Sequence, residues 1–107
     1  MNQAERVVEK RRELVSVANS VLAGRLNPIE GIRQICALRF AVDDPENEAF
    51  LAARGIDSET DTFPLGSRRE ICSSAYLNRM DGVMRSYLAD AHRDIDQACR
   101  EIVRAFS

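Results

Sequence analysis

"SSAYLNRMDGVMRSYLADAHRDIDQACREIVRAF", residues 73–106, is the stretch that decides the fold. Its apolar residues recur three, four or seven positions apart, and no proline interrupts them, which places them along one face of a helix. The face consists of Leu77, Met80, Met84, Tyr87, Leu88, Ala91, Ile95, Ala98 and Ile102. The stretch therefore predicts one helix about 45 Å long at 1.5 Å per residue. Gly82 is the expected kink or break, because glycine costs roughly 1 kcal/mol in a helix interior.

Three earlier segments also have helical signals. Residues 3–24 form an amphipathic pattern that ends at a glycine, and a second helix is predicted to begin at Asn27, as its cap, and a following proline. Residues 44–55 predict a short third helix, with Asp44 as its cap and with Phe50 and Leu51 docked on the core. The sequence thus predicts a single all-α domain over residues 1–107, an antiparallel bundle of about four helices with an ordered loop before the last.

Composition limits the class of protein. A chain of 107 residues, 45% hydrophobic and 30% charged, is typical of one soluble domain. Three widely spaced cysteines and one histidine favour neither a disulfide framework nor a zinc site. The charged N-terminus and the lack of a long apolar run predict a cytoplasmic protein that does not bind a membrane. Arginines dispersed among acids, without an aromatic–basic stripe, disfavour nucleic-acid binding.

Negative charge is concentrated in one part of the chain. Residues 43–61 carry seven carboxylates and one arginine, whereas the segments on either side are slightly basic. Such a patch repels phosphates and attracts a cation or a basic protein surface. Acidic helix starts present carboxylates outward, so the predicted partner contacts lie in this segment. They are Asp43, Asp44, Glu46, Glu48 and Glu59.

The end of this segment, "GIDSETDTFPLGSRR" at residues 55–69, admits several interpretations. It lacks the glycine and glutamate of a calcium loop, although a magnesium site built from one or two acids stays open. With no histidine nearby, catalysis is the weaker hypothesis, and no catalytic residue, metal site or cofactor is predicted. The favoured interpretation is a hydrogen-bonded loop in which Asp57 and Asp61 turn toward Arg69, while Glu59 is left for a partner. This predicted buried network consists of Arg33, Asp57, Ser58, Asp61 and Arg69.

These residues, with "LNPIEGIRQICALR" at residues 26–39, resemble a family of small bacterial proteins that share an Asp-Ser-Glu-Thr-Asp-x-x-Pro-x-Gly-x-x-Arg loop. The resemblance runs from about Leu26 to Phe106, and it departs from the pattern at Cys72, where a tryptophan is expected. Members resemble immunity proteins of contact-dependent growth inhibition and other polymorphic toxin systems. The matching positions are Glu30, Gly31, Arg33, Asp57, Ser58, Glu59, Thr60, Asp61, Pro64, Gly66 and Arg69.

The resemblance implies a non-catalytic immunity protein that binds a cognate toxin domain and covers its active cleft. The acidic segment suits a basic, nuclease-type toxin. Two alternatives stay open. One is a small metal-dependent hydrolase that uses Asp57, Glu59 and Asp61. The other is a helical adaptor or homodimer in which the long last helix packs against a second copy, so the expected state is a monomer or a weak homodimer.

Overall fold

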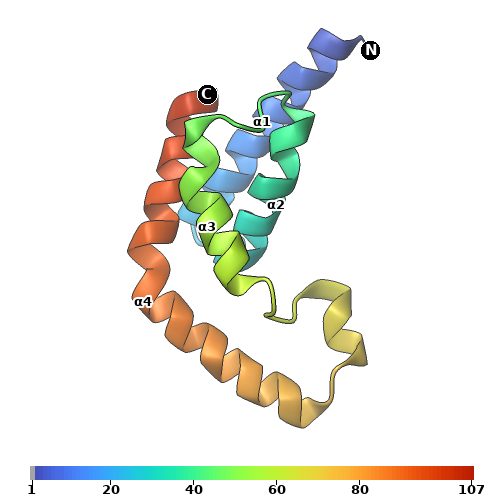
Figure 1. Ribbon diagram of the computed structural model, residues 1–107, viewed down its shortest axis with the longest axis vertical. Coiled ribbons are helices and arrows are strands. Elements are labelled where there is room, and N and C mark those ends of the chain that lie inside the picture. Colours follow the sequence, from blue (N-terminus) through green and yellow to red (C-terminus); the bar gives the residue numbers. More distant parts are fainter. Residues whose placement is uncertain (1) are drawn as a thin grey trace.

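A computed structural model of the chain describes residues 2–107 and contains four α-helices, with no strand in that range (Figure 1). The prediction of an all-α bundle with a long last helix is confirmed. Two short 3-10 helices, η1 and η2, precede α3 and α4. The elements are α1 (Gln3–Leu22), α2 (Pro28–Ala41), η1 (Glu48–Phe50), α3 (Leu51–Thr60), η2 (Gly66–Ile71) and α4 (Ser74–Phe106). Within residues 2–107, no helix has both the length and the apolarity that a membrane crossing requires.

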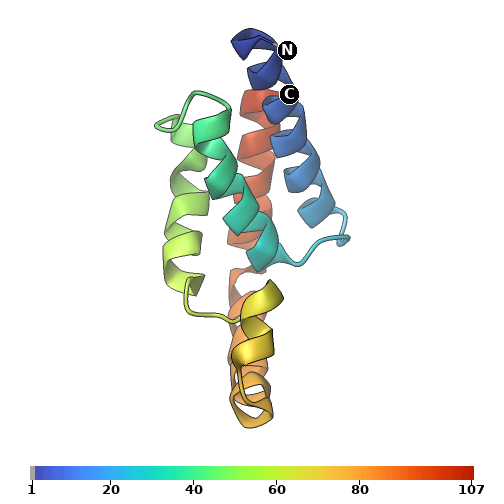
Figure 2. The ribbon, with the colours of Figure 1, turned by 90° about the vertical axis from the view of Figure 1, so that its right-hand side faces the viewer.

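The helices form an up-and-down bundle. Helices α1 and α3 each pack against both α2 and α4, and successive helices run in opposite directions. The two chain ends therefore lie at one end of the bundle, and the first half of α4 lies beyond the other end (Figures 1 and 2). Short connections between antiparallel neighbours are the usual topology of such bundles.

The helix starts follow local capping chemistry. The Asn27 side chain accepts hydrogen bonds from the backbone N–H groups of Ile29 and Glu30 at 2.9 and 3.2 Å, and Pro28 is the first helical residue of α2. Ser73 caps α4 in the same way, through a bond from the N–H of Tyr76. These caps satisfy N–H groups that have no partner within the helix. The predicted starts of α2 and α4 are confirmed.

The third helix differs from its prediction. Asp44 and Pro45 lie in a turn, Asn47 caps η1, and the helical segment continues through Gly55 to Thr60. Gly55 adopts an ordinary helical conformation instead of ending the helix, so half of the predicted loop is helical. Asp43, with φ of 58°, makes the reversal after α2, a conformation that Asp tolerates better than most residues.

The main core lies between the four helices. Its fully buried members include Leu14, Ile32, Ile35, Phe50, Ala98 and Ile102. Phe50 reaches it from η1, and its ring lies 5.3 Å from that of Phe106 near the end of α4. The prediction that Phe50 docks is therefore confirmed, whereas the Leu51 side chain points outward and is 62% exposed.

Helix α4 runs unbroken through Gly82, contrary to the prediction of a break there, and its axis bends about midway along its length (Figure 1). The half before the bend, with residues 61–73 folded back on it, forms what we call the arm, residues 61–88. A second apolar cluster joins the arm to the start of α2. It contains Ile29, Phe63 and Met84 as buried members, with Leu65, Met80, Tyr87 and Leu88 packed around them.

Candidate functional site: two grooves beside α3

The three acids of the predicted loop lie on opposite sides of α3. Successive helical residues are about 100° apart, so Asp57 and Asp61, four positions later, lie on the same side of α3. Glu59, two positions after Asp57, points to the other side. Asp57 and Asp61 line a cleft between α2 and α3, and Glu59 lines a groove between α3 and α4. The three carboxylates offered as a hydrolase site therefore do not converge. Among residues 2–107, no three His, Cys, Asp or Glu side chains are placed so that they could hold one metal ion.

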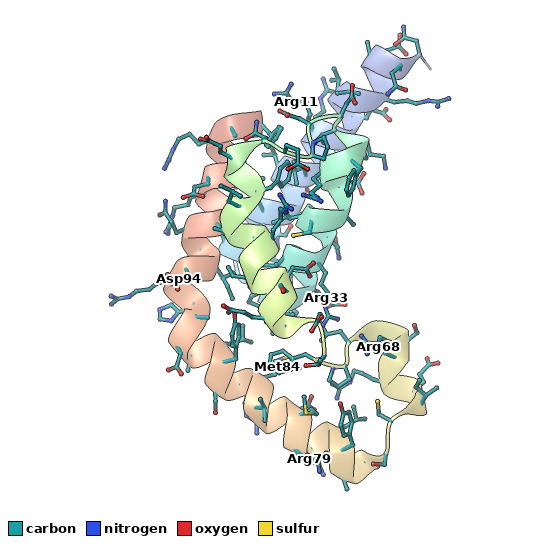
Figure 3. All side chains as sticks on the ribbon, in the orientation of Figure 1. Arg11, Arg33, Arg68, Arg79, Met84 and Asp94 are labelled. Carbon is teal, nitrogen blue, oxygen red and sulfur yellow. The ribbon has the colours of Figure 1, made fainter. Side chains whose placement is uncertain are left out.

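The α2–α3 cleft, of about 610 Å³, contains more arginines than acids. Arg33 donates to the carbonyl oxygens of Thr60 and Phe63 at 2.6 and 2.8 Å, and Arg68 donates to that of Asp61 at 3.3 Å. Both guanidinium groups lie where α3 ends (Figure 3), and they satisfy carbonyls that have no partner in the helix. The cleft is lined by Arg33, Cys36, Ala37, Arg39, Phe40, Arg54, Asp57, Ser58, Asp61 and Arg68.

The prediction that Asp57 and Asp61 bond to Arg69 is wrong. Arg69 makes a two-pronged ion pair with Asp81 of α4, at 2.7 and 2.9 Å, and donates to the carbonyl of Pro64 at 3.3 Å. In the part of the chain that the structure describes, the side chains of Asp57, Ser58 and Asp61 form no ion pair. In the network that does form, arginine side chains donate hydrogen bonds to backbone carbonyl oxygens and to the carboxylate of Asp81. These acceptors lie where the arm folds back.

The Arg69–Asp81 pair has an electrostatic signature. Its hydrogen bonds hold the pKa of the Asp81 carboxyl below the ordinary value of 3.8, and they raise the pKa of Arg69. Both side chains are about one-third exposed, so water screens the pair. Its main effect is geometric, because a two-pronged bond fixes η2 against α4 in one orientation.

The thiols of Cys36 and Cys99 are protonated at neutral pH. Cys36 lines the α2–α3 cleft, where burial, followed by the charge of Asp57, raises its pKa to about 12. Burial in the main core similarly raises the pKa of Cys99 to about 11. A thiol is a poor nucleophile and a poor metal ligand compared with its thiolate. These two cysteines therefore act as apolar packing residues.

The other side of α3 has the opposite charge. A groove of about 490 Å³ between α3 and α4 carries the carboxylates of Glu59, Asp90 and Asp94 and no basic side chain. It meets a second hollow of about 570 Å³, lined by Glu48, Glu101 and Arg104 among others, and the two share Leu51 and Ala52. We call the two together the acidic groove. Its remaining lining residues include the small side chains of Ala49, Ala52, Gly55, Ala91 and Ala105.

Glu59 is held in place at the end of the acidic groove. It accepts a hydrogen bond of 2.9 Å from the hydroxyl of Tyr87, whose ring packs edge-on against Phe63 at 5.8 Å between centroids. Burial, and then the bond to Glu59, raises the pKa of Tyr87 to about 12, so the hydroxyl stays a donor. The acidic groove is thus tied to the apolar cluster of the arm.

The other predicted contact residues lie on the turn between α2 and η1 and at the start of η1. Asp43, Asp44, Glu46 and Glu48 are all exposed. Asp44 accepts a bond from the Asn47 amide at 2.9 Å, and Glu46 pairs with Arg54 at 3.4 Å. Of the five, only Glu48 and Glu59 line the acidic groove.

Sequence reasoning missed the half of the acidic groove that α4 provides. Asp90, Asp94 and Glu101 follow one another at intervals of four and seven residues, which places them on one face of a helix. That spacing was the available signal, but it lies outside the acidic segment of the chain. Comparisons of the chain with models of protein families, with curated proteins and with solved structures returned no match.

Proposed function

We propose that this chain is a non-catalytic, cytoplasmic immunity protein that binds a basic toxin domain through the acidic groove. The observation that carries the proposal is the composition of that groove. Five carboxylates line it with one arginine, on both sides of a floor of small residues. They are Glu48, Glu59, Asp90, Asp94 and Glu101.

Charge and shape both support a basic protein as the partner. Carboxylates arranged around a concave surface speed the encounter with a positive surface and disfavour partners of the same sign. Leu51 lies between the two hollows with 62% of its surface exposed, so an apolar contact is available at the centre of a charged rim. A buried apolar centre within a polar rim is the usual anatomy of a protein interface.

The charge on the opposite side of α3 determines from which side a basic partner can approach. The α2–α3 cleft presents Arg33, Arg39, Arg54 and Arg68, which repel a basic surface. A basic toxin therefore approaches from the α3–α4 side and not from the α2 side. The toxin-neutralising role itself comes from the resemblance of residues 26–39 and 56–69 to immunity proteins.

The test begins with the protein encoded by the adjacent gene, which is expected to contain the toxin domain. Co-expression of this chain is expected to restore growth to cells that make the toxin, and the purified proteins are expected to form a stable 1:1 complex. Undiminished toxin activity in the presence of excess chain would overturn the function.

The role of the acidic groove is tested by charge reversal. The double variant Asp90→Lys with Asp94→Lys is expected to weaken the complex by tenfold or more, on the order of 1.4 kcal/mol, with a slower association rate. The matched control is Glu13→Lys with Glu70→Lys, which changes net charge equally at two exposed acids on α1 and η2. Equal weakening by both double variants would show that net charge matters and that this groove is not the contact.

A further inference from the structure

The first turns of α1 extend past the rest of the bundle. Figures 1 and 2 both show this end of the helix beyond the ends of its neighbours. Helix α1 turns Leu14, Ala18 and Val21 into the main core. A second row of apolar residues, Ala4, Val8 and Val15, runs along the outer side of the helix. Ala4 and Val8 are exposed, Val8 by 48%, and Val15 is partly buried against the main core. An amphipathic helix with a second apolar row has a face that the bundle does not cover.

This outward row borders a groove between α1 and the end of α4. The groove has a volume of about 720 Å³, and its apolar part consists of Val8, Val15 and Phe106. Arg11, Arg12 and Arg25 also line it, and none of its lining residues is Asp or Glu. Toward the chain start it is continued by a hollow of about 440 Å³, whose lining includes Ala4, Glu5, Val8, Glu9 and Arg12.

Charges follow a fixed order along this face. Glu5 and Glu9 come first, and Arg11 and Arg12 follow, with Val8 among them. Glu5 and Arg11 lie three residues before and after Val8, and Arg12 lies four after it, so all three are its neighbours on the helix surface. In the described chain, neither Arg11 nor Arg12 forms an ion pair, and Arg11 lies 5.3 Å from the centre of the Phe106 ring.

We propose that this face binds a second copy of the chain, with the two α1 helices antiparallel and a twofold axis between Val8 and Glu9. That arrangement places Glu5 of each copy opposite Arg12 of the other, so the interface contains two identical Glu5–Arg12 ion pairs. The apolar rows pack at the centre, next to Phe106. The same surface on both subunits makes a closed dimer and not a filament. This inference is independent of the proposed toxin binding, which uses the opposite side of α4.

The dimer is weak. Its contact consists of one exposed helix face and the end of α4, which is toward the low end of specific interfaces, below about 1,200 Å² in total. The proposal also replaces the hypothesis of a dimer formed through the long last helix, because the self-complementary order of charges is on α1.

Sedimentation velocity over a range of about 5 µM to 1 mM tests the contact. The average mass of the unaltered chain is expected to rise toward that of a dimer, and Val8→Glu is expected to keep it monomeric. Val83→Glu is the matched control, because Val83 is also 48% exposed but lies on the arm. A mass independent of concentration, or loss of the dimer in Val83→Glu instead, would overturn the proposal.

A charge exchange tests the antiparallel pairing directly. Glu5→Arg and Arg12→Glu are each expected to weaken self-association about tenfold, because each places like charges opposite each other twice. Mixed in equal amounts, the two variants are expected to form a heterodimer as strong as the original dimer, since both contacts are then attractive. Helix content by circular dichroism shows that each variant is folded. If the mixture associates no more strongly than either variant alone, the antiparallel pairing of Glu5 with Arg12 is contradicted.

Discussion

The bundle and the arm are held together by different interactions. In the bundle, aliphatic and aromatic side chains from all four helices are fully removed from water. The arm is held by the second cluster, whose buried members Phe63 and Met84 meet Ile29 of α2. This cluster is supplemented by arginine bonds to carbonyl oxygens and by the Arg69–Asp81 pair. None of the six residues of η2 is buried. Segments with few buried apolar contacts open at lower free energy than a core, so we expect the arm to open before the bundle unfolds.

The difference gives the unusual loop sequence a role. Arg33, Pro64 and Arg69, which belong to the pattern on which the proposed resemblance rests, all contribute to bonds that fold the arm back. Glu59, in the same pattern, connects the arm to the acidic groove through Tyr87. The pattern therefore fixes the arm, while the acids of α4 supply much of the proposed binding surface.

The largest effect is expected from the bundle. Replacing Phe50 with alanine removes a fully buried ring that contacts Phe106, and it leaves a cavity. The free energy of unfolding is expected to fall by about 3–5 kcal/mol, as is usual for buried phenylalanine. Urea denaturation followed by circular dichroism measures the change. A loss below about 1 kcal/mol would show that η1 does not complete the main core.

A matched substitution in the arm is expected to act locally. Phe63→Ala removes the aromatic centre of the second cluster, but its global cost is limited by the free energy needed to open the arm alone. The free energy of unfolding, measured by urea denaturation, is expected to fall by only about 1 kcal/mol. Limited proteolysis within residues 61–73 is expected to become rapid. Val83→Ala, at an exposed site of the arm, serves as control. Cooperative loss of the whole fold on Phe63→Ala would show that bundle and arm are one unit.

Acid is expected to loosen the arm through Asp81. Its lowered pKa means that the pair contributes fully above the ordinary carboxyl value of 3.8 and is lost as the pH falls through the lowered value. Pepsin cleavage of the arm, compared between the unaltered chain and Asp81→Asn, measures this loss. At pH 4 the unaltered chain is expected to be cut more slowly than the variant, and the difference between the two rates is expected to shrink as the pH falls toward 2. Equal rates at both pH values contradict the account.

The smallest effect concerns glycine. A methyl group at Gly55 meets no atom within 4 Å, so Gly55→Ala is expected to stabilise the bundle by about 0.5–1 kcal/mol. Thermal unfolding is expected to shift upward by a few degrees. Gly31→Ala is the opposite case, because its methyl group overlaps the side chain of Val21, so it destabilises by about 1–3 kcal/mol. A destabilising Gly55→Ala would contradict the open position of that residue.

Local chemistry explains which parts of the fold the sequence predicts. The Asn27–Pro28 start of α2 and the helical period of residues 73–106 are properties of neighbouring residues, and both were predicted correctly. The expected kink or break at Gly82 was not, since α4 continues through that residue. The bounds of α3 were predicted wrongly. Asp44 and Pro45 satisfy the usual rules for a helix start, and Gly55 satisfies those for a helix end, yet α3 runs from Leu51 to Thr60. Packing of Phe50 on the core and the arginine bonds at the end of α3 override those rules.

The site was predicted only in part, for a related reason. Charge counting found Glu48 and Glu59, since they lie in one acidic segment. It could not find that Asp90 and Asp94 face them from α4, because helix pairing sets that arrangement. Likewise, Arg69 bonds to a residue twelve positions away, whereas nearer carboxylates had been favoured as its partners.

The most direct test of the difference between bundle and arm is native-state hydrogen exchange along α4, followed by NMR at increasing urea. Amides of residues 74–88 are expected to exchange through a local opening that depends little on urea. Amides of residues 95–106 are expected to exchange only through global unfolding, at a higher free energy and with a steep dependence on urea. A single free energy and a single urea dependence along the whole of α4 would contradict the account.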